Sequence, residues 1–135
     1  MAILYSVPPG TVLLCDYDTG FRLPEMVKRR PCIVLSPRLS HRDGLCAVVP
    51  LSGTQPAREL PYHVRLDLDL PLPWGLKPRW AKADMVSTVC FGRLDMFRTD
   101  RDRVSGRRKY LQIKVNTEQL DAVKAAVLHG LGLSR

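Results

Sequence analysis

The sequence predicts a mainly antiparallel β fold that ends in one α-helix. Short runs rich in β-branched and aliphatic residues follow one another along most of the chain, separated by turn residues. No helical pattern alternates with these runs, and apolar residues at helical spacing are found near the C-terminus. This order favours a small antiparallel barrel or a strongly coiled sheet over a parallel α/β fold.

The first predicted strand is TVLLCDYD, which ends at the turn Thr19-Gly20. A polar loop follows and leads into PCIVLSP, which is bounded by two prolines and is too short for a helix. We expect a buried strand of about five residues there. GLCAVVPLS is its predicted hairpin partner, because Asp43-Gly44 before it is a strong turn signal.

The middle of the chain contains one clear alternating strand. In YHVRLDLDL, apolar and polar residues alternate from Tyr62 onward, which predicts a half-buried strand. PLPWGLKPRW contains three prolines and a glycine, so we expect an irregular surface loop. DMVSTVCF then predicts another strand.

The C-terminal part combines a basic segment, a strand and a helix. Six basic residues lie between Arg98 and Lys109, where we expect a short loop or turn before a final strand in KYLQIKV. Asn116 can cap the following helix and Gln119 can complete a capping box. The apolar residues of this helix fall at helical spacing before Gly130: Leu120, Val123, Val127 and Leu128.

Length and composition predict one domain over residues 1–135, with its core over about 10–130. The longest apolar runs are far shorter than the roughly 20 residues of a membrane span, and MAILYSVPPG lacks the charged start of a signal peptide. We therefore expect a cytoplasmic protein without membrane contact. The four cysteines form no C-x-x-C pair, so no metal site, disulfide framework or cofactor is predicted.

The charge balance points to a polyanionic partner. The chain has 21 Lys and Arg against 13 Asp and Glu, which gives a net charge of +8 and a pI near 9.7. Composition alone leaves open whether that partner is a nucleic acid, because many basic proteins bind none.

The stretch EMVKRRPCIVLSP places cations directly before a buried strand. Arg30 offers a planar, permanently charged fork that matches phosphate oxygens, and a rigid strand can hold it in position. The alternative is structural: Arg30 extends out of the core into water or pairs with Glu25.

The order of GTVLLCDYD, RRPCIVLSP, VVPLS and KADMVSTV resembles the MazF/PemK family of toxin endoribonucleases. Three elements carry the resemblance: Glu25 five residues before Arg30-Pro31, then Pro50 with Ser52, then Lys82 with Asp84. The resemblance implies an SH3-like β-barrel that forms a homodimer. It also implies cleavage of single-stranded RNA without a metal, leaving a 2′,3′-cyclic phosphate and a 5′-hydroxyl, and inhibition by a cognate antitoxin.

The resemblance implies catalytic roles for five residues, namely Arg30, Ser52, Glu25, Lys82 and Asp84. Ser52 stands where the family usually has Thr, and Thr54 is an alternative hydroxyl and a candidate RNA contact. Glu25 is a general base or a partner that holds Arg30. Lys82 and Asp84 match a pair assigned as acid and base, with Lys in place of Arg. Pro24 stands where one branch of the family has His, which puts a His-assisted mechanism in doubt.

Further residues are candidates for RNA binding. Lys28, Arg29 and the basic segment before the last strand are expected to follow the RNA backbone or to receive an acidic antitoxin tail, with a solvated loop as the alternative for the segment. Trp74 is open between base stacking and structure, whereas Trp80 is interpreted as structural. Arg79 is also expected to contact RNA. The alternative function is a non-catalytic toxin of the same fold, such as a CcdB-like gyrase poison, or an RNA-binding module.

Overall fold

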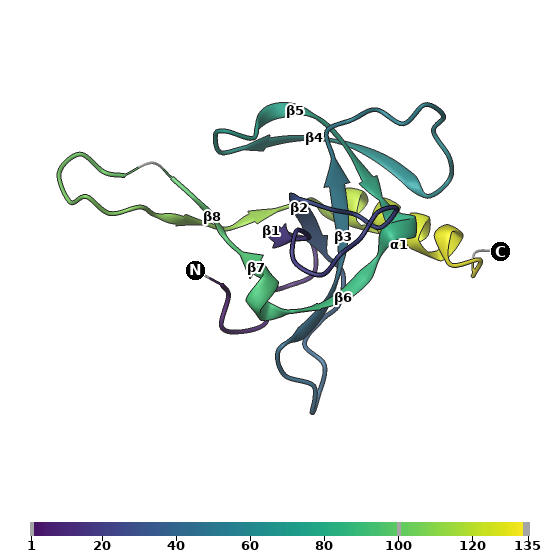
Figure 1. Ribbon diagram of the computed structural model, residues 1–135, viewed down its shortest axis with the longest axis horizontal. Helices are drawn as coiled ribbons and strands as arrows, with labels where there is room; N and C mark the ends of the chain where they lie inside the picture. Colours follow the sequence, from purple (N-terminus) through teal and green to yellow (C-terminus); the bar gives the residue numbers. More distant parts are fainter. Residues whose placement is uncertain (1, 100, 134–135) are drawn as a thin grey trace.

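The computed structural model describes residues 2–99 and 101–133 and shows a curved antiparallel sheet with one helix against it (Figure 1). The strands pair in the order β10-β1-β2-β3-β5-β4, while β6 adds to β3 and β7 adds to β1. The predicted fold class is confirmed: mainly antiparallel β with a C-terminal helix. The sheet curls like a barrel but does not close, because β10 and β4 stand at the two ends of the pairing order.

The main strands are β1 (Thr11–Asp16), β2 (Arg29–Val34), β3 (Leu45–Ser52), β4 (His63–Leu70), β5 (Gly75–Lys82) and β6 (Ser87–Cys90). The short elements are the 3₁₀ turns η1 (Ala83–Met85) and η2 (Phe91–Arg93) and the strands β7 (Leu94–Asp95), β8 (Phe97–Arg98), β9 (Tyr110–Leu111) and β10 (Ile113–Lys114). The helix α1 runs over Thr117–Gly130.

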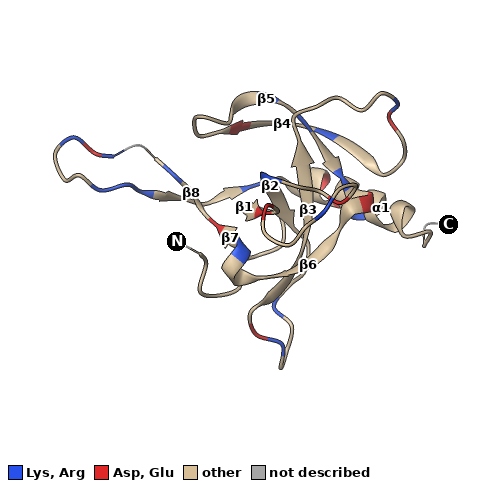
Figure 2. Ribbon diagram, viewed as in Figure 1, with Lys and Arg blue, Asp and Glu red and all other residues tan. Residues whose placement is uncertain are grey.

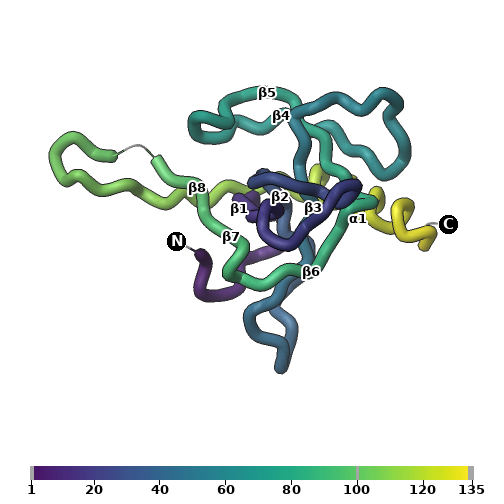
Figure 3. The backbone as a smooth tube through the Cα atoms, viewed as in Figure 1, coloured from purple at the N-terminus to yellow at the C-terminus, as the bar shows by residue number. Residues whose placement is uncertain are grey.

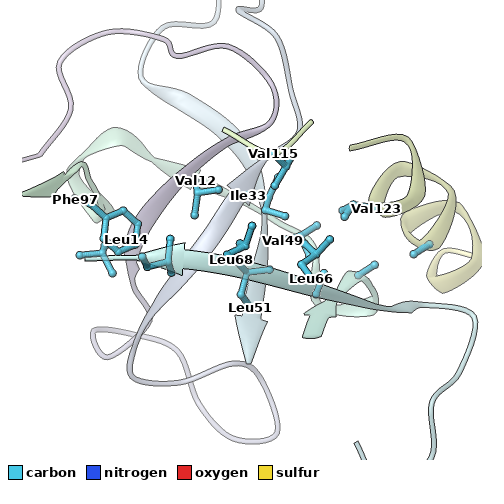
Figure 4. Close-up of a cluster of buried hydrophobic side chains, with 14 residues drawn as sticks. Val12, Leu14, Ile33, Val49, Leu51, Leu66, Leu68, Phe97, Val115 and Val123 are labelled. Carbon is cyan, nitrogen blue, oxygen red and sulfur yellow. The ribbon is translucent and has the colours of Figure 1, made fainter. Parts of the chain in front are cut away.

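The strands β1, β2 and β3 have continuous apolar stretches because both faces of this part of the sheet are buried. On one face, Val12, Ile33 and Val49 pack with Val123 of α1 (Figure 4). On the other face lies a second cluster that is rich in sulfur: Leu13, Cys15, Cys32, Val34, Cys46 and Val48, with others. A strand buried on both sides needs no polar alternation, so these runs give no period of two.

The expectation of an irregular loop in PLPWGLKPRW is wrong for its second half. Residues 75–82 form β5, which pairs with β4 along its full length. The prediction of a loop relied in part on Pro78, which lies within β5. At that position β5 is bonded to β4 alone, because its pairing with β3 is confined to Trp80 and Ala81, so a proline can lie there without removing a ladder hydrogen bond.

The helix prediction is confirmed in detail. The Asn116 side chain accepts from the Gln119 N–H at 2.7 Å, and the Gln119 side chain accepts from the Asn116 N–H at 2.9 Å. Gly130 at the other end packs on η1, since a methyl group added there would lie 2.9 Å from the Asp84 Cα. Within the described residues, no helix has both the length and the apolarity that a membrane span needs.

The two remaining strand predictions are shorter than expected. DMVSTVCF starts with η1 before β6, and KYLQIKV divides into β9 and β10. The basic segment before β9 is a long hairpin arm that projects from the body, instead of the short loop or turn that the sequence predicted (Figures 1 and 3). Lys and Arg lie along this arm, and its described residues 101–110 are exposed (Figure 2).

Candidate active site

The strand β2 begins at Arg29, two residues before Pro31, so both arginines belong to the strand and not to the loop. Arg30 pairs with Cys15 of β1 and lies two residues before Cys32 in β2. Residues two apart in a strand share a face, so Arg30 lies on the sulfur-rich face. Its Nε donates to the Val27 carbonyl at 3.3 Å. The guanidinium is thus half-buried and fixed at one nitrogen, with its terminal nitrogens left for a ligand.

Ser52 lies on the same face as Arg30. The pairing of β2 with β3 includes Cys32 opposite Pro50, and the same register continued by two residues sets Arg30 opposite Ser52. Ser52 is 8% exposed, and its Oγ accepts from the Thr54 backbone N–H at 3.2 Å. Because that contact uses the oxygen as an acceptor, the Ser52 hydroxyl proton remains available for donation.

The same face continues onto β5. Ser52 pairs with Trp80, and the register continued by two residues brings Lys82 beside Pro50. Trp80 is 6% exposed, and its Nε1 donates to Glu59 Oε1 at 2.9 Å, which ties the loop of residues 53–62 to the sheet. This geometry supports the structural interpretation of Trp80. Arg30, Ser52 and Lys82 therefore form one polar row across three strands.

The two predicted carboxylates lie outside this row. Glu25 closes a turn: its Oε1 accepts from the Arg22 N–H at 2.9 Å, and its own N–H donates to the Arg22 carbonyl at 2.8 Å. In the described part of the chain no ion pair joins Glu25 to Arg30. Asp84 lies in η1 with its side chain exposed and its backbone against Gly130.

The loop between β1 and β2 is held by contacts that the sequence does not reveal. Arg93 Nη1 donates to the carbonyls of Asp16 at 2.9 Å and Thr19 at 2.6 Å, and its guanidinium lies 4.9 Å from the Phe21 ring centre. The Tyr17 N–H donates to the Lys28 carbonyl at 2.9 Å, with Lys28 at φ 73°. Arg93 is more than 70 residues away in the sequence from both carbonyls that it contacts, so no local motif could predict these hydrogen bonds.

The predicted RNA-binding residues divide into exposed and buried groups. Lys28, Arg29 and Thr54 are exposed and Trp74 is partly buried. Arg79 is 2% exposed, which corrects the expectation that it contacts RNA. Its Nη2 donates to the Trp74 carbonyl at 2.7 Å, and burial lowers the pKa of its guanidinium. Arg79 supports Trp74 from within the core.

Sequence reasoning missed Lys77, because it treated β5 as a loop. A methyl group added at Gly53 would lie 2.9 Å from the Lys77 Nζ, so this ammonium group covers the turn that follows Ser52. Among the described residues, no cluster of three His, Cys, Asp or Glu side chains is arranged to hold a metal ion.

Comparison with protein families gives a match over residues 9–131 to the PemK-like, MazF-like toxins of type II toxin–antitoxin systems. The uncharacterised protein YifN of Escherichia coli K12 is 32% identical over 122 residues, which cover 75% of this chain and 80% of YifN. An uncharacterised Haemophilus influenzae protein is 32% identical over 98 residues, which cover 63% of this chain and 66% of that protein.

Solved structures show the same fold. MazF from Deinococcus radiodurans superposes with a TM-score of 0.62 at 23% identity, covering 96% of this chain and 99% of MazF. A mycobacterial endoribonuclease in complex with its cognate antitoxin gives a TM-score of 0.62 at 21% identity, with the same coverage of 96% and 99%. With the family match spanning nearly the whole sequence, the chain belongs to the PemK-like, MazF-like toxin family of type II toxin–antitoxin systems.

Proposed function

We propose that this protein is an endoribonuclease toxin that cleaves single-stranded RNA without a metal ion. The observation that carries the proposal is that Arg30 of β2 and Ser52 of β3 lie on the same face of neighbouring strands, where the register of Cys32 with Pro50, continued by two residues, would set them opposite each other. A guanidinium and a hydroxyl so arranged can bind the oxygens of one phosphate. The endoribonuclease names of the structural neighbours support the same activity.

In this mechanism the ribose 2′-hydroxyl attacks the adjacent phosphorus. The bond from phosphorus to O2′ forms and the bond to O5′ breaks, which leaves a 2′,3′-cyclic phosphate and a 5′-hydroxyl. Arg30 binds the non-bridging oxygens as negative charge grows in the phosphorane, and the Ser52 hydroxyl donates to one of them. Arg30 is the second residue of a strand whose following residues are buried, so its position needs little reorganisation during the reaction.

Proton transfer requires a base for the 2′-hydroxyl and an acid for the leaving O5′. Lys82 lies on the same face as Ser52 and can protonate the leaving oxygen. Glu25 and Asp84 are exposed carboxylates outside the row and are the two candidates for the base. Glu25→Gln and Asp84→Asn separate them, because the variant of the true base should lose most of the cleavage rate while the other variant keeps it.

The partners follow from the same proposal. We propose a homodimer, a cytoplasmic RNA substrate and a cognate antitoxin that inhibits cleavage. The antitoxin is supported by the neighbour solved in complex with one. The positive charge of +8 suits both an RNA backbone and an acidic inhibitor segment.

The test is cleavage of mixed single-stranded RNA in EDTA. We expect Arg30→Ala to slow cleavage at least about 100-fold, in the range seen when one charge-stabilising group is removed. Arg38→Ala is the matched control, since it removes the same charge from an exposed loop. Thermal unfolding should be similar for both variants. Cleavage by Arg30→Ala at the wild-type rate would contradict the site, and intact RNA with the wild-type protein would favour a non-catalytic toxin, tested with gyrase and DNA.

A further inference from the structure

A second basic site lies where the arm joins the body. A cavity of about 150 Å³ is lined by Arg29 of β2, Arg98 of β8, Arg108 of the arm and Trp74 of the turn between β4 and β5. The arm and this turn project from the same side of the molecule (Figure 1). Three guanidinium groups and an indole from four separate segments therefore surround one small space, which we name the arm pocket.

The arm pocket is distinct from the candidate active site. Arg29 and Arg30 are consecutive in β2, so their side chains leave opposite faces of the sheet. Leu14, which also lines the arm pocket, belongs to the core cluster under α1, whereas Cys15 beside Arg30 belongs to the sulfur-rich cluster. A chain that passes around the start of β2 can reach both places.

The walls of the arm pocket are held in place by the body. The Trp74 N–H donates to the Pro71 carbonyl at 3.0 Å, and the Trp74 carbonyl accepts from buried Arg79 at 2.7 Å. The Arg79 guanidinium also lies 5.8 Å from the Trp74 ring centre. Arg29 donates to Asp95 at 3.2 Å and is 46% exposed, so part of its fork remains open.

The base of the arm is ordered as well. Phe97 pairs with Leu111 and Arg98 pairs with Tyr110. Beyond that pair, the Thr99 N–H donates to the Lys109 carbonyl at 2.8 Å, and the Lys109 N–H donates to Thr99 Oγ1 at 2.9 Å. Within the described residues, neither Arg98 nor Arg108 forms an ion pair. Arg98 is partly buried and Arg108 is exposed, so both guanidinium groups can bind an anion at this pocket.

We propose that the arm pocket binds one nucleotide of the single-stranded RNA substrate, outside the cleaved bond. The phosphate lies between the arginines, and the base stacks on Trp74. The indole favours RNA over an acidic antitoxin tail, because carboxylates would use the arginines but would not need an aromatic platform. This inference rests on the proposed function, which supplies RNA as the substrate. It places part of the RNA binding on a different face of the sheet from the cleavage.

The test measures binding of 2′-O-methylated single-stranded RNA by fluorescence anisotropy. This RNA has no free 2′-hydroxyl, so it cannot be cut. We expect Arg108→Ala and Trp74→Ala each to weaken binding about tenfold, and Trp74→Phe to restore most of the loss. Arg103→Ala removes the same charge from the exposed end of the arm and should weaken binding at most about twofold, as a non-specific charge does.

With cleavable RNA, the arm-pocket variants should raise KM and leave kcat within about twofold of wild type. Equal weakening by Arg103→Ala and Arg108→Ala, or no effect of Trp74→Ala, would overturn the proposal in favour of diffuse charge. An oligo-glutamate peptide that loses affinity with Arg108→Ala while RNA binding is unchanged would assign the surface to an acidic protein instead. If Arg30→Ala still cleaves RNA, only the proposed active site is contradicted. The arm-pocket proposal is tested separately, because RNA binding measured by anisotropy does not depend on cleavage.

Discussion

Arg29 and Arg30 are neighbours in the sequence, yet they serve two different surfaces. Arg30 stands over buried cysteines and faces a hydroxyl across the sheet, whereas Arg29 pairs with Asp95 beside an aromatic ring and a basic arm. The alternation of a β-strand divides one basic motif between two faces. Two neighbouring charges are thereby available separately, one for the proposed chemistry and the other for the proposed RNA binding.

The two surfaces also differ in how deeply their supporting segments are buried. Arg30 is fixed on a strand whose both faces are buried, and transition-state stabilisation depends on such preorganisation. The arm is exposed over residues 101–110 and packs on the body through its base. Exposed charge suits capture of a flexible polyanion, whose backbone offers phosphates at many positions.

The largest expected effect compares what the strand β2 and the arm each contribute to the free energy of unfolding. Ile33 is fully buried, so Ile33→Ala should lower the free energy of unfolding by about 2 to 5 kcal/mol through lost burial and a cavity. Replacement of residues 99–109 by an Asn-Gly turn should change it by less than about 1 kcal/mol, because loop length costs little. Urea unfolding measures both, and a large loss from the shortened arm would show that the arm belongs to the core.

A lysine substitution sharpens the comparison at the level of single charges. Arg30→Lys keeps the charge but loses the bidentate fork, so we expect RNA cleavage to slow at least about tenfold. Arg98→Lys should weaken RNA binding less than about threefold, since a point charge is sufficient for a flexible phosphate contact. Single-turnover cleavage and anisotropy report the two effects. If both lysine substitutions had similarly small effects, Arg30 and Arg98 would not differ in role as proposed.

The smallest expected effect concerns the buried thiols of the sulfur-rich cluster. Burial raises the pKa of Cys46 from 9.0 to about 11 and also raises the pKa of Cys32. The unfolded chain therefore loses thiol protons first, and the stability that these groups contribute is complete below pH 9 and falls as pH rises toward 11.

At pH 10, ionisation of Cys46 in the unfolded chain should lower the free energy of unfolding by about 1 kcal/mol. Urea unfolding from pH 8 to 10.5 should show a smaller alkaline decline for Cys46→Ala than for wild type. Cys90→Ala is the control, because the Cys90 thiol is exposed. Parallel declines in all three proteins would show that the cysteine layer does not resist ionisation.

Local signals made part of the structure predictable. The capping box at Asn116 and Gln119 is contained within four residues, so the start of α1 could be identified from sequence. The apolar runs of β1 to β3 also predicted strands correctly. The strand β5 was missed because three prolines and a glycine outweighed its pairing with β4, which only the fold supplies.

The residues of the candidate site were proposed from the family resemblance, whereas their relative placement could not be predicted. Arg30, Ser52 and Lys82 were chosen from sequence, but their common face depends on the registers of β2 with β3 and of β3 with β5. Arg79 was named as an RNA contact without any sign of its burial, which depends on the turn at Trp74 whose carbonyl it binds.

By itself, the sequence determined the strand-rich class, the cap of the helix, the excess of positive charge and the motif that places arginines before a buried strand. These features depend on neighbouring residues and on composition, which are the same in any conformation. Only the tertiary structure decided which arginine faces which partner and that Arg29, Trp74, Arg98 and Arg108 share one pocket. Such long-range contacts arise from strand register and curvature, which depend on the packing of the whole chain at once.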